Sequence, residues 1–170
     1  MRLNPIKAVP LASLVARVER WLVRQPDVLL ASSNAALRLL EAQGVPGQRL
    51  VWFPDGADVS QFRPQPVDRA LESTFGIAGK RTVVFLGLLT PYQGVDLLID
   101  AASDVVRQVP SAHFLLMGYP DEDRYRAMVA KRGLQSSVTV PGRIPYAEAA
   151  RHLSLGMVAV SPKLSATEAN

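Results

Sequence analysis

The feature that most constrains this fold is a regular alternation of short apolar runs and helical segments after residue 80. Runs rich in valine, leucine and phenylalanine predict strands, whereas the segments between them have the spacing of helices. This alternation is typical of βαβ units, whose parallel strands carry helices on both faces. The sequence therefore predicts an α/β fold with a parallel sheet. The predicted strands are 81–87, 112–118, 137–142 and 157–162, and the predicted helices are 94–108, 121–132 and 146–154.

The first 55 residues predict a smaller set of elements. Residues 11–24 place apolar side chains on one helical face and arginines mostly elsewhere, which indicates an amphipathic helix. This helix either packs on its own domain or touches an anionic membrane surface. Buried strands are expected at 27–33 and 49–53, and the helix between them is expected to be capped within residues 32–34, Ser-Ser-Asn. Prolines and glycines after residue 53 predict a connection and a domain boundary.

Composition excludes several kinds of site. The 170 residues contain no cysteine, so disulfides, thiolate metal sites and cysteine nucleophiles are excluded, and a reducing cytoplasm is the simplest compartment. His113 and His152 are the two histidines, both expected to be structural, and no metal is expected. The apolar runs are too short to span a membrane. A net charge of +4, with its excess near the N-terminus, favours phosphates or anionic lipid, whereas no nucleic-acid-binding motif is present.

The carboxyl ends of the predicted strands are the expected ligand site, because open parallel sheets bind ligands there. Three of the four turns begin with a glycine, at Gly87, Gly118 and Gly142, which permits a tight turn or a close approach of backbone to ligand. The turn at 87–94 lacks the G-x-G-x-x-G pattern of dinucleotide-binding dehydrogenases, and the segment 76–81 lacks the spacing of a P-loop. Neither of these nucleotide-binding motifs is therefore predicted.

Two stretches of the chain resemble a known family. DVLLASSNAALRLLEAQGVPGQRLVWFPDGADVSQFRP, at 27–64, followed by GLLTPYQGVDLLIDA, at 87–101, resembles the retaining glycosyltransferases of family 4. The resemblance implies the GT-B fold, in which two Rossmann-like domains face each other and the second binds a nucleotide-sugar donor. Residues 55–64 are similar to the family's interdomain junction, N-G-V-D-x-x-x-F-x-P, with Asp55 and Ala57 as substitutions.

The resemblance also implies how the chain is divided. Residues 1–55 would be the C-terminal remnant of the acceptor-side domain, 56–79 the interdomain connection and lead-in, and 80–170 the first part of the donor-binding domain. Residues 168–170 are similar to the first three residues of the family's E-x-x-G-x-x-x-x-E motif. We therefore expect an incomplete GT-B fold, a fragment truncated inside that motif, which is inactive in isolation and only marginally stable because apolar surface is left exposed.

Candidate catalytic residues follow from the same comparison. Glu168 would approach the donor sugar, as the first carboxylate of the family's motif does. The arginine and lysine with which the family usually holds the donor diphosphate are replaced here by Leu88 and Gln93. Lys163 follows a strand predicted to end at the cleft, so it is the candidate that supplies positive charge in their place. The catalytic candidates are therefore Glu168 and Lys163.

The donor-binding candidates surround the same strand ends. Thr90 and the amides near Gly94 are placed to receive phosphate oxygens at a helix N-terminus. The resemblance implies that Arg143 lies beside the donor base, that backbone groups of Ile144 contact this base, and that Tyr119 lines its pocket. The full set of candidates is Gly87, Leu88, Thr90, Gln93, Gly94, Gly118, Tyr119, Arg143, Ile144 and Asn170.

The function implied by the resemblance is transfer of a sugar from a nucleoside-diphosphate sugar to an unknown glycan, lipid or small-molecule acceptor, with retention of anomeric configuration and without a cofactor or metal. The alternative is a degenerate GT-B module that binds a nucleotide or a partner without catalysis, motivated by Leu88 and Gln93. Another GT-B enzyme, such as a sugar-nucleotide 2-epimerase or a phosphorylase, is a third reading. A cytoplasmic protein is expected, with peripheral contact at the inner membrane face left open.

Overall fold

The computed structural model describes residues 12–164, which divide into two compact units between Asp58 and Val59. We call residues 12–58 the first unit and residues 59–164 the second unit. The division falls inside the stretch predicted to connect two domains. Among the described residues, no helix is long and apolar enough to cross a membrane.

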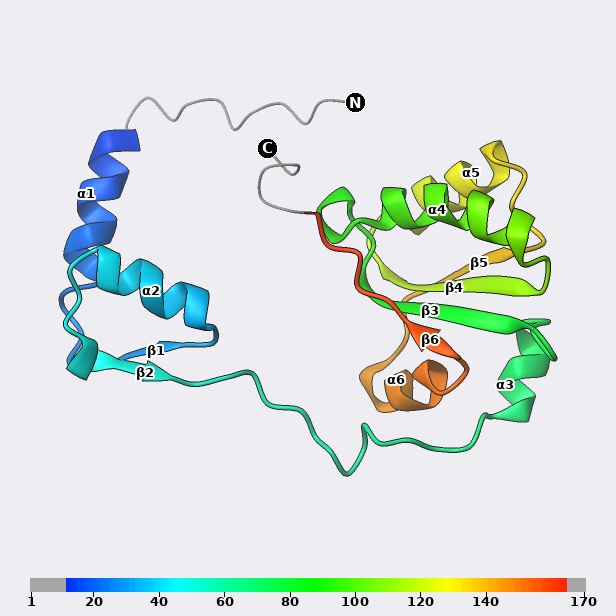
Figure 1. Ribbon diagram of the computed structural model, residues 1–170, viewed down its shortest axis with the longest axis horizontal. Coiled ribbons are helices and arrows are strands. Elements are labelled where there is room, and N and C mark those ends of the chain that lie inside the picture. Colours follow the sequence, from blue (N-terminus) through cyan, green and yellow to red (C-terminus); the bar gives the residue numbers. More distant parts are fainter. Residues whose placement is uncertain (1–11, 165–170) are drawn as a thin grey trace. The chain divides into compact units, whose positions relative to one another are not determined.

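The first unit is a short βαβ arrangement preceded by a helix (Figure 1). Strands β1 and β2 pair in parallel, with Leu29 opposite Leu50. The hydroxyl of Ser33 accepts a hydrogen bond from the amide of Ala36 at 3.1 Å, so the predicted cap lies at this serine. The elements are α1 (Ala12–Leu22), β1 (Leu29–Ala31), α2 (Asn34–Ala42), η1 (Gly47–Arg49) and β2 (Leu50–Trp52).

The apolar face of α1 is exposed in the structure. Trp21 and Leu22 are 61% and 51% exposed, and the face is completed by Leu14, Val15 and Val18. The helix is therefore amphipathic as predicted, but within the described residues this face is not packed against the first unit.

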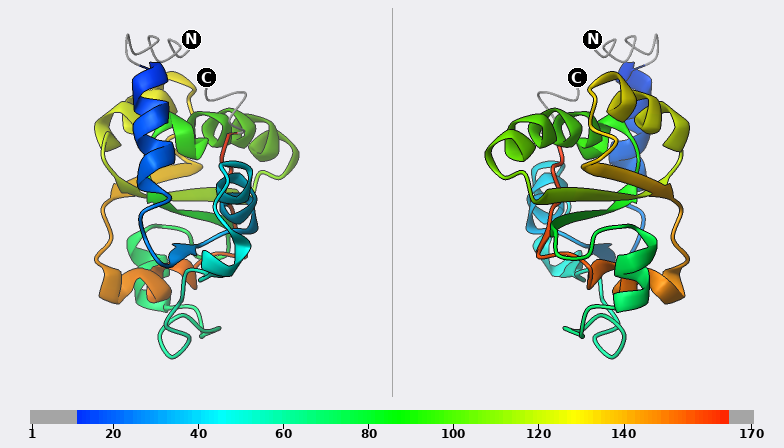
Figure 2. Two further views of the ribbon diagram at one scale, coloured as in Figure 1. Left: turned by 90° about the vertical axis from the view of Figure 1, so that its left-hand side faces the viewer. Right: turned by 90° about the vertical axis from the view of Figure 1, so that its right-hand side faces the viewer.

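The second unit is a four-stranded parallel sheet in the order β5-β4-β3-β6. Helices α4 and α5 cover one face, and α3 and α6 cover the other (Figures 1 and 2). Strands β3 and β4 pair along their whole length, from Arg81 opposite Ala112 to Leu88 opposite Tyr119. The elements are α3 (Arg69–Thr74), β3 (Arg81–Leu88), η2 (Pro91–Gln93), α4 (Val95–Gln108), β4 (Ala112–Tyr119), α5 (Glu122–Lys131), β5 (Val138–Gly142), α6 (Tyr146–Leu153) and β6 (Val158–Ala159).

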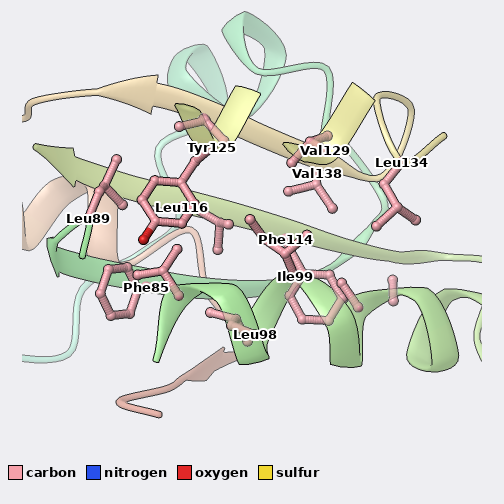
Figure 3. Packing of buried hydrophobic residues seen from close by; sticks show 14 residues of the cluster. Phe85, Leu89, Leu98, Ile99, Phe114, Leu116, Tyr125, Val129, Leu134 and Val138 are labelled. Carbon is pink, nitrogen blue, oxygen red and sulfur yellow. The ribbon is translucent and has the colours of Figure 1, made fainter. Parts of the chain in front are cut away.

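The core of the second unit has two layers because successive residues of a strand point to opposite faces. Phe114 and Leu116 of β4 pack with α4 and α5 in the larger layer, shown in Figure 3, whereas Leu115 and Met117 pack in the smaller layer on the other face. Ile99 of α4 is fully buried in the larger layer. This double cover explains why the strands read as continuous apolar runs.

Two elements differ from the sequence-based prediction. Strand β6 contains two residues rather than the predicted six, because it pairs only with β3 at the sheet edge and the chain leaves the ladder before Pro162. Helix α3 was not predicted and lies in the stretch assigned to the connection. The carboxylate of Asp68 starts α3 by accepting hydrogen bonds from the amides of Ala70 and Leu71 at 2.9 and 3.0 Å.

Candidate functional site

A cleft of about 370 Å³ opens at the carboxyl ends of the central strands of the second unit. It contains the end of β3, the end of β4, and the turn that joins β5 to α6. Six of the predicted donor-binding residues line it: Gly87, Leu88, Gly118, Tyr119, Arg143 and Ile144. Gly87 and Ile144 are 57 positions apart in the sequence (144 minus 87), and the structure brings them together at this cleft.

Three further lining residues were not identified from the sequence, namely Leu86, Tyr146 and Ala149. Tyr146 begins α6 and is held there by two contacts from the segment after the unit boundary. Its ring meets that of Phe62 edge to face at 5.5 Å, and its carbonyl accepts a hydrogen bond from Gln61 at 3.1 Å. Tyr146 could have been identified from the sequence, because it follows the Gly142 turn and is the first residue of the next helix.

The floor of the cleft depends on the glycine pair Gly87 and Gly118, which lie opposite each other in β3 and β4. A Cβ atom on Gly118 would lie 1.8 Å from the carbonyl oxygen of Gly87. No side chain fits at that distance, so Gly118 is required for the two strands to approach here.

The turn from β3 to α4 holds the other predicted phosphate-binding groups. The amides of Gln93 and Gly94 are already used in the turn, because they donate to the carbonyls of Thr90 and Pro91 at 3.1 and 2.9 Å. Leu98 is the first residue of α4 to bond back along the helix, to Gly94 at 2.9 Å. The first turn of α4, residues 95–97, comes directly after these two amides and belongs to the helix start predicted near Gly94.

The segment after β6 lies against this same turn. The amide of Leu164 donates to the carbonyl of Tyr92 at 3.4 Å, and a Cβ atom on Gly94 would lie 1.7 Å from the carbonyl oxygen of Pro162. Lys163, between these two contacts, is exposed. The chain thus carries Lys163 to the turn that contains Gln93, the position at which the family usually has a lysine. The two remaining candidates, Glu168 and Asn170, lie outside the described residues.

A partly buried network holds the start of α4 against α5. The carboxylate of Asp96 accepts hydrogen bonds from Arg124 at 2.6 Å and from the hydroxyl of Tyr125 at 3.1 Å. Arg124 also donates to the Tyr125 hydroxyl at 2.7 Å. Burial and the neighbouring Asp96 carboxylate raise the pKa of Tyr125 to about 12, so this hydroxyl stays protonated and donates. The network fixes the direction of the first turn of α4.

Arg143 lies over the ring of Tyr119, with its guanidinium carbon 5.0 Å from the ring centroid. This is the distance of a cation–π contact. Both side chains are exposed at the cleft. The contact holds the guanidinium group beside the apolar lining.

Neither histidine belongs to the cleft lining. Burial, with a smaller contribution from the charge of Lys80, lowers the pKa of His113, and its Nε2 lies 2.9 Å from the hydroxyl of Thr139. Nδ1 of His152 lies 2.9 Å from the carbonyl of Glu148. Between residues 12 and 164, no three of the acidic and histidine side chains gather as a metal site would require.

Comparison with known proteins agrees with this arrangement. The family model of the glycosyl transferases group 1 matches residues 69–169. This range covers more than half of the chain, and the chain therefore belongs to the group 1 glycosyl transferases.

Two curated relatives illustrate the similarity. The chain is 31% identical over 137 residues to the GDP-mannose-dependent alpha-(1-6)-phosphatidylinositol monomannoside mannosyltransferase of Mycobacterium tuberculosis, and this match covers 79% of the chain and 35% of the relative. It is 28% identical over 173 residues to the D-inositol 3-phosphate glycosyltransferase of Nocardia farcinica, covering 88% of the chain and 38% of that relative. The chain thus spans little more than a third of the length of either enzyme.

The fold is also shared with solved structures. Anabaena HepE in complex with UDP superimposes with a TM-score of 0.76 at 19% identity, covering 96% of this chain and 45% of that one. The likeness shows that the fold is part of the GT-B architecture, with Rossmann-like α/β units, as the sequence predicted.

Proposed function

We propose that the cleft of the second unit binds a nucleoside-diphosphate sugar, and that the protein transfers this sugar to an acceptor with retention of anomeric configuration. The observation that carries the proposal is the position of the cleft at the carboxyl ends of β3 and β4, from which the short turn of residues 89–94 leads into α4. A diphosphate suits the helix N-terminus, and a nucleoside suits the apolar cleft next to it. The printed names of the relatives, which include a GDP-mannose-dependent enzyme, support a sugar donor of this class.

In the proposed reaction, the bond between the anomeric carbon and the diphosphate oxygen breaks, and an acceptor hydroxyl forms the new bond on the same face of the sugar. The hydroxyl proton leaves to the diphosphate. Negative charge grows on the departing diphosphate, so the first-turn amides of α4 and the ammonium of Lys163 are the groups proposed to stabilise it. Glu168 is proposed to orient the sugar. No metal or other cofactor is required by this scheme.

Lys163 tests the proposed charge stabilisation. A charge-assisted hydrogen bond contributes roughly 1.5 to 3 kcal/mol, so Lys163→Ala should lower kcat roughly tenfold to a hundredfold while the free energy of unfolding stays unchanged. Lys131→Ala is the matched control, because this exposed lysine ends α5. The measurement is donor-dependent transfer by the protein expressed from its native gene. A normal kcat for Lys163→Ala would contradict the role given to this lysine.

A second function is favoured by Leu88. This residue is 43% exposed at the cleft, at the position where the family usually has an arginine. Together with Gln93 it removes two cations from the diphosphate site, which corresponds to about 3 to 6 kcal/mol of charge-assisted hydrogen bonding. The alternative is therefore a module that binds a nucleotide without transferring the sugar. Isothermal titration with GDP, UDP and their sugar conjugates, followed by a transfer assay, separates the two, because the alternative predicts binding without turnover.

The acceptor and the location are proposed from the first unit and from the relatives. One relative acts, by its name, on a phosphatidylinositol monomannoside, which is a lipid. Helix α1 presents Trp21 and Leu22 together with Arg17 and Arg20, the pattern of a helix that lies on an anionic membrane. We propose a cytoplasmic protein in peripheral contact with the inner membrane face. Sedimentation with anionic vesicles, and loss of this binding in Trp21→Ala, is the test.

A further inference from the structure

We infer that Arg143 makes the donor cleft selective for guanine nucleotides. The inference rests on the proposed function, because it concerns the base of the proposed donor. It names the base, which neither the fold nor the family assignment fixes: the structural neighbour HepE is in complex with UDP, whereas one relative is named for GDP-mannose.

The position of the base follows from the chemistry of the two ends of the site. The first turn of α4 presents backbone amides, which suit phosphate oxygens. The cleft beside it is lined by Leu86, Tyr119, Ile144 and Tyr146, whose apolar and aromatic surfaces suit a planar base. A nucleoside diphosphate therefore fits with its phosphates at α4 and its base among these side chains.

Arg143 is the cation that lines this part of the cleft. Its guanidinium lies over the Tyr119 ring, and among residues 12–164 no carboxylate pairs with it. Arg126 makes an instructive contrast, since it lies near the same end of β5. Its guanidinium donates to the carbonyl of Val140 at 3.0 Å, to that of Pro141 at 3.3 Å and to Asp123 at 2.8 Å. Arg126 is thus committed to the protein, whereas Arg143 keeps its N–H donors at the cleft.

The geometry of the guanidinium decides which base it prefers. Two adjacent N–H groups of arginine match the two adjacent acceptors of guanine, O6 and N7. Adenine replaces one of these acceptors with an amino donor, and uracil separates its two carbonyl oxygens by an N–H group. Stacking on Tyr119 restricts the side chain before the base arrives, so less conformational freedom is lost on binding. A matched bidentate pair corresponds to a preference of roughly tenfold to a hundredfold.

The first experiment requires no substitution. The dissociation constants of GDP, IDP, 7-deaza-GDP, UDP and ADP are measured by isothermal titration of the unmodified protein. IDP keeps both acceptors and should bind about as tightly as GDP, whereas 7-deaza-GDP lacks N7 and should bind roughly tenfold more weakly, along with UDP and ADP. Equal binding of GDP and 7-deaza-GDP, or tighter binding of UDP than of GDP, would overturn the inference and leave the proposed nucleotide site standing. Absence of binding by every nucleotide would overturn both.

The second experiment assigns the selectivity to the residue. Arg143→Ala should reduce the ratio of UDP to GDP dissociation constants to near one, and Arg143→Lys, which keeps the charge without the fork, should reduce it nearly as far. Arg107→Ala is the control, because this exposed arginine pairs with Asp104 near the end of α4. If Arg143→Lys keeps the unmodified ratio, charge alone is responsible and the bidentate assignment is wrong. If Arg143→Ala keeps it, the residue has no part in selection.

Discussion

The two units are built from the same kinds of element but differ in what covers their strands. In the second unit, helices cover both faces of the sheet, and residues such as Ile99, Leu115 and Leu116 are fully buried. In the described part of the first unit, Ala31 and Val45 are the buried hydrophobic residues, whereas Leu30 and Trp52 on its two strands are 61% and 57% exposed. A two-stranded sheet that a single short helix, α2, covers buries little apolar surface and is marginal in water. We infer that most of the folding stability of these residues resides in the second unit.

The distribution of aromatic residues allows the two units to be followed separately. Both tryptophans, Trp21 and Trp52, lie in the first unit, and all four tyrosines lie in the second. Tryptophan fluorescence therefore reports the first unit, and the nuclear magnetic resonance signals of the tyrosine rings report the second. We expect the fluorescence transition to come at the lower denaturant concentration. Coincident transitions would instead show that the units unfold as one.

The largest expected effect is on the core of the second unit. Leu116→Ala removes a fully buried side chain from the layer under α4 and α5, so it should lower the free energy of unfolding by about 2 to 5 kcal/mol. The matched control, Leu39→Ala, removes the same atoms from a side chain on α2 that is 61% exposed, and a change within about 0.5 kcal/mol is expected. Equal losses from the two substitutions would show that the first unit is as well covered as the second.

A smaller effect is expected at the cap of α2. Ser33→Ala removes the acceptor for the amide of Ala36 and should lower the stability of the first unit by about 1 kcal/mol, measured by tryptophan fluorescence. The tyrosine signal should not move, because the cap makes its contact within the first unit. Ser32→Ala, one position earlier and outside the helix, serves as the control. A shift in both signals would show that the two units do not unfold independently.

An alkaline effect is expected from Tyr125 in the second unit. The folded state holds this hydroxyl protonated to about pH 12, whereas the unfolded state loses the proton near its ordinary value of 10.0. The contribution to stability is therefore complete below pH 10 and is lost as the pH rises toward 12. Tyr125→Phe cannot ionise and should remove this dependence. If the free energy of unfolding of Tyr125→Phe still falls steeply at alkaline pH, other groups are responsible for that fall.

An acidic effect of the opposite sign is expected from His113. Burial lowers its pKa below 6.5, so the unfolded chain takes up a proton before the folded chain does. The unfolding free energy should therefore be undiminished above pH 6.5 and should fall as the pH decreases below it. His113→Gln removes the titrating group and can still reach Thr139. Comparison of its unfolding curves at pH 7 and pH 5 with those of the unmodified protein measures the difference.

The contrast between the units also shows what the sequence could predict. The predicted bounds of β3, β4 and β5 lie within one residue of those in the structure, because a sheet covered on both faces requires continuous apolar runs. Helix α3 was missed, since it has six residues and follows a proline-rich stretch, and its start depends on the single cap Asp68. Strand β6 was predicted too long because apolar composition cannot show where pairing with β3 ends.

At the site, the sequence identified groups whose position follows from a strand end. Gly87, Tyr119 and Arg143 each come at or just after such an end, and all three line the cleft. At the helix start predicted to receive phosphate, the amides of Gln93 and Gly94 are used by the 3₁₀ turn, and the first turn of α4 follows directly after them. Which amides a turn consumes depends on its backbone geometry, and the glycine and proline content of the segment does not specify this.

Gly94 and Gly118 should behave differently in a library of all single substitutions, because one glycine is required for folding and the other for activity. At Gly118, any side chain meets the backbone of Gly87 in the middle of a sheet. At Gly94 it meets the backbone of Pro162, in a segment whose described residues make one 3.4 Å hydrogen bond to the turn. The sheet cannot yield, whereas the segment can. Variants at Gly118 should disappear from a screen for soluble protein, whereas variants at Gly94, where φ is 74° and a side chain adds strain, should survive it in larger number and be lost in a screen for activity.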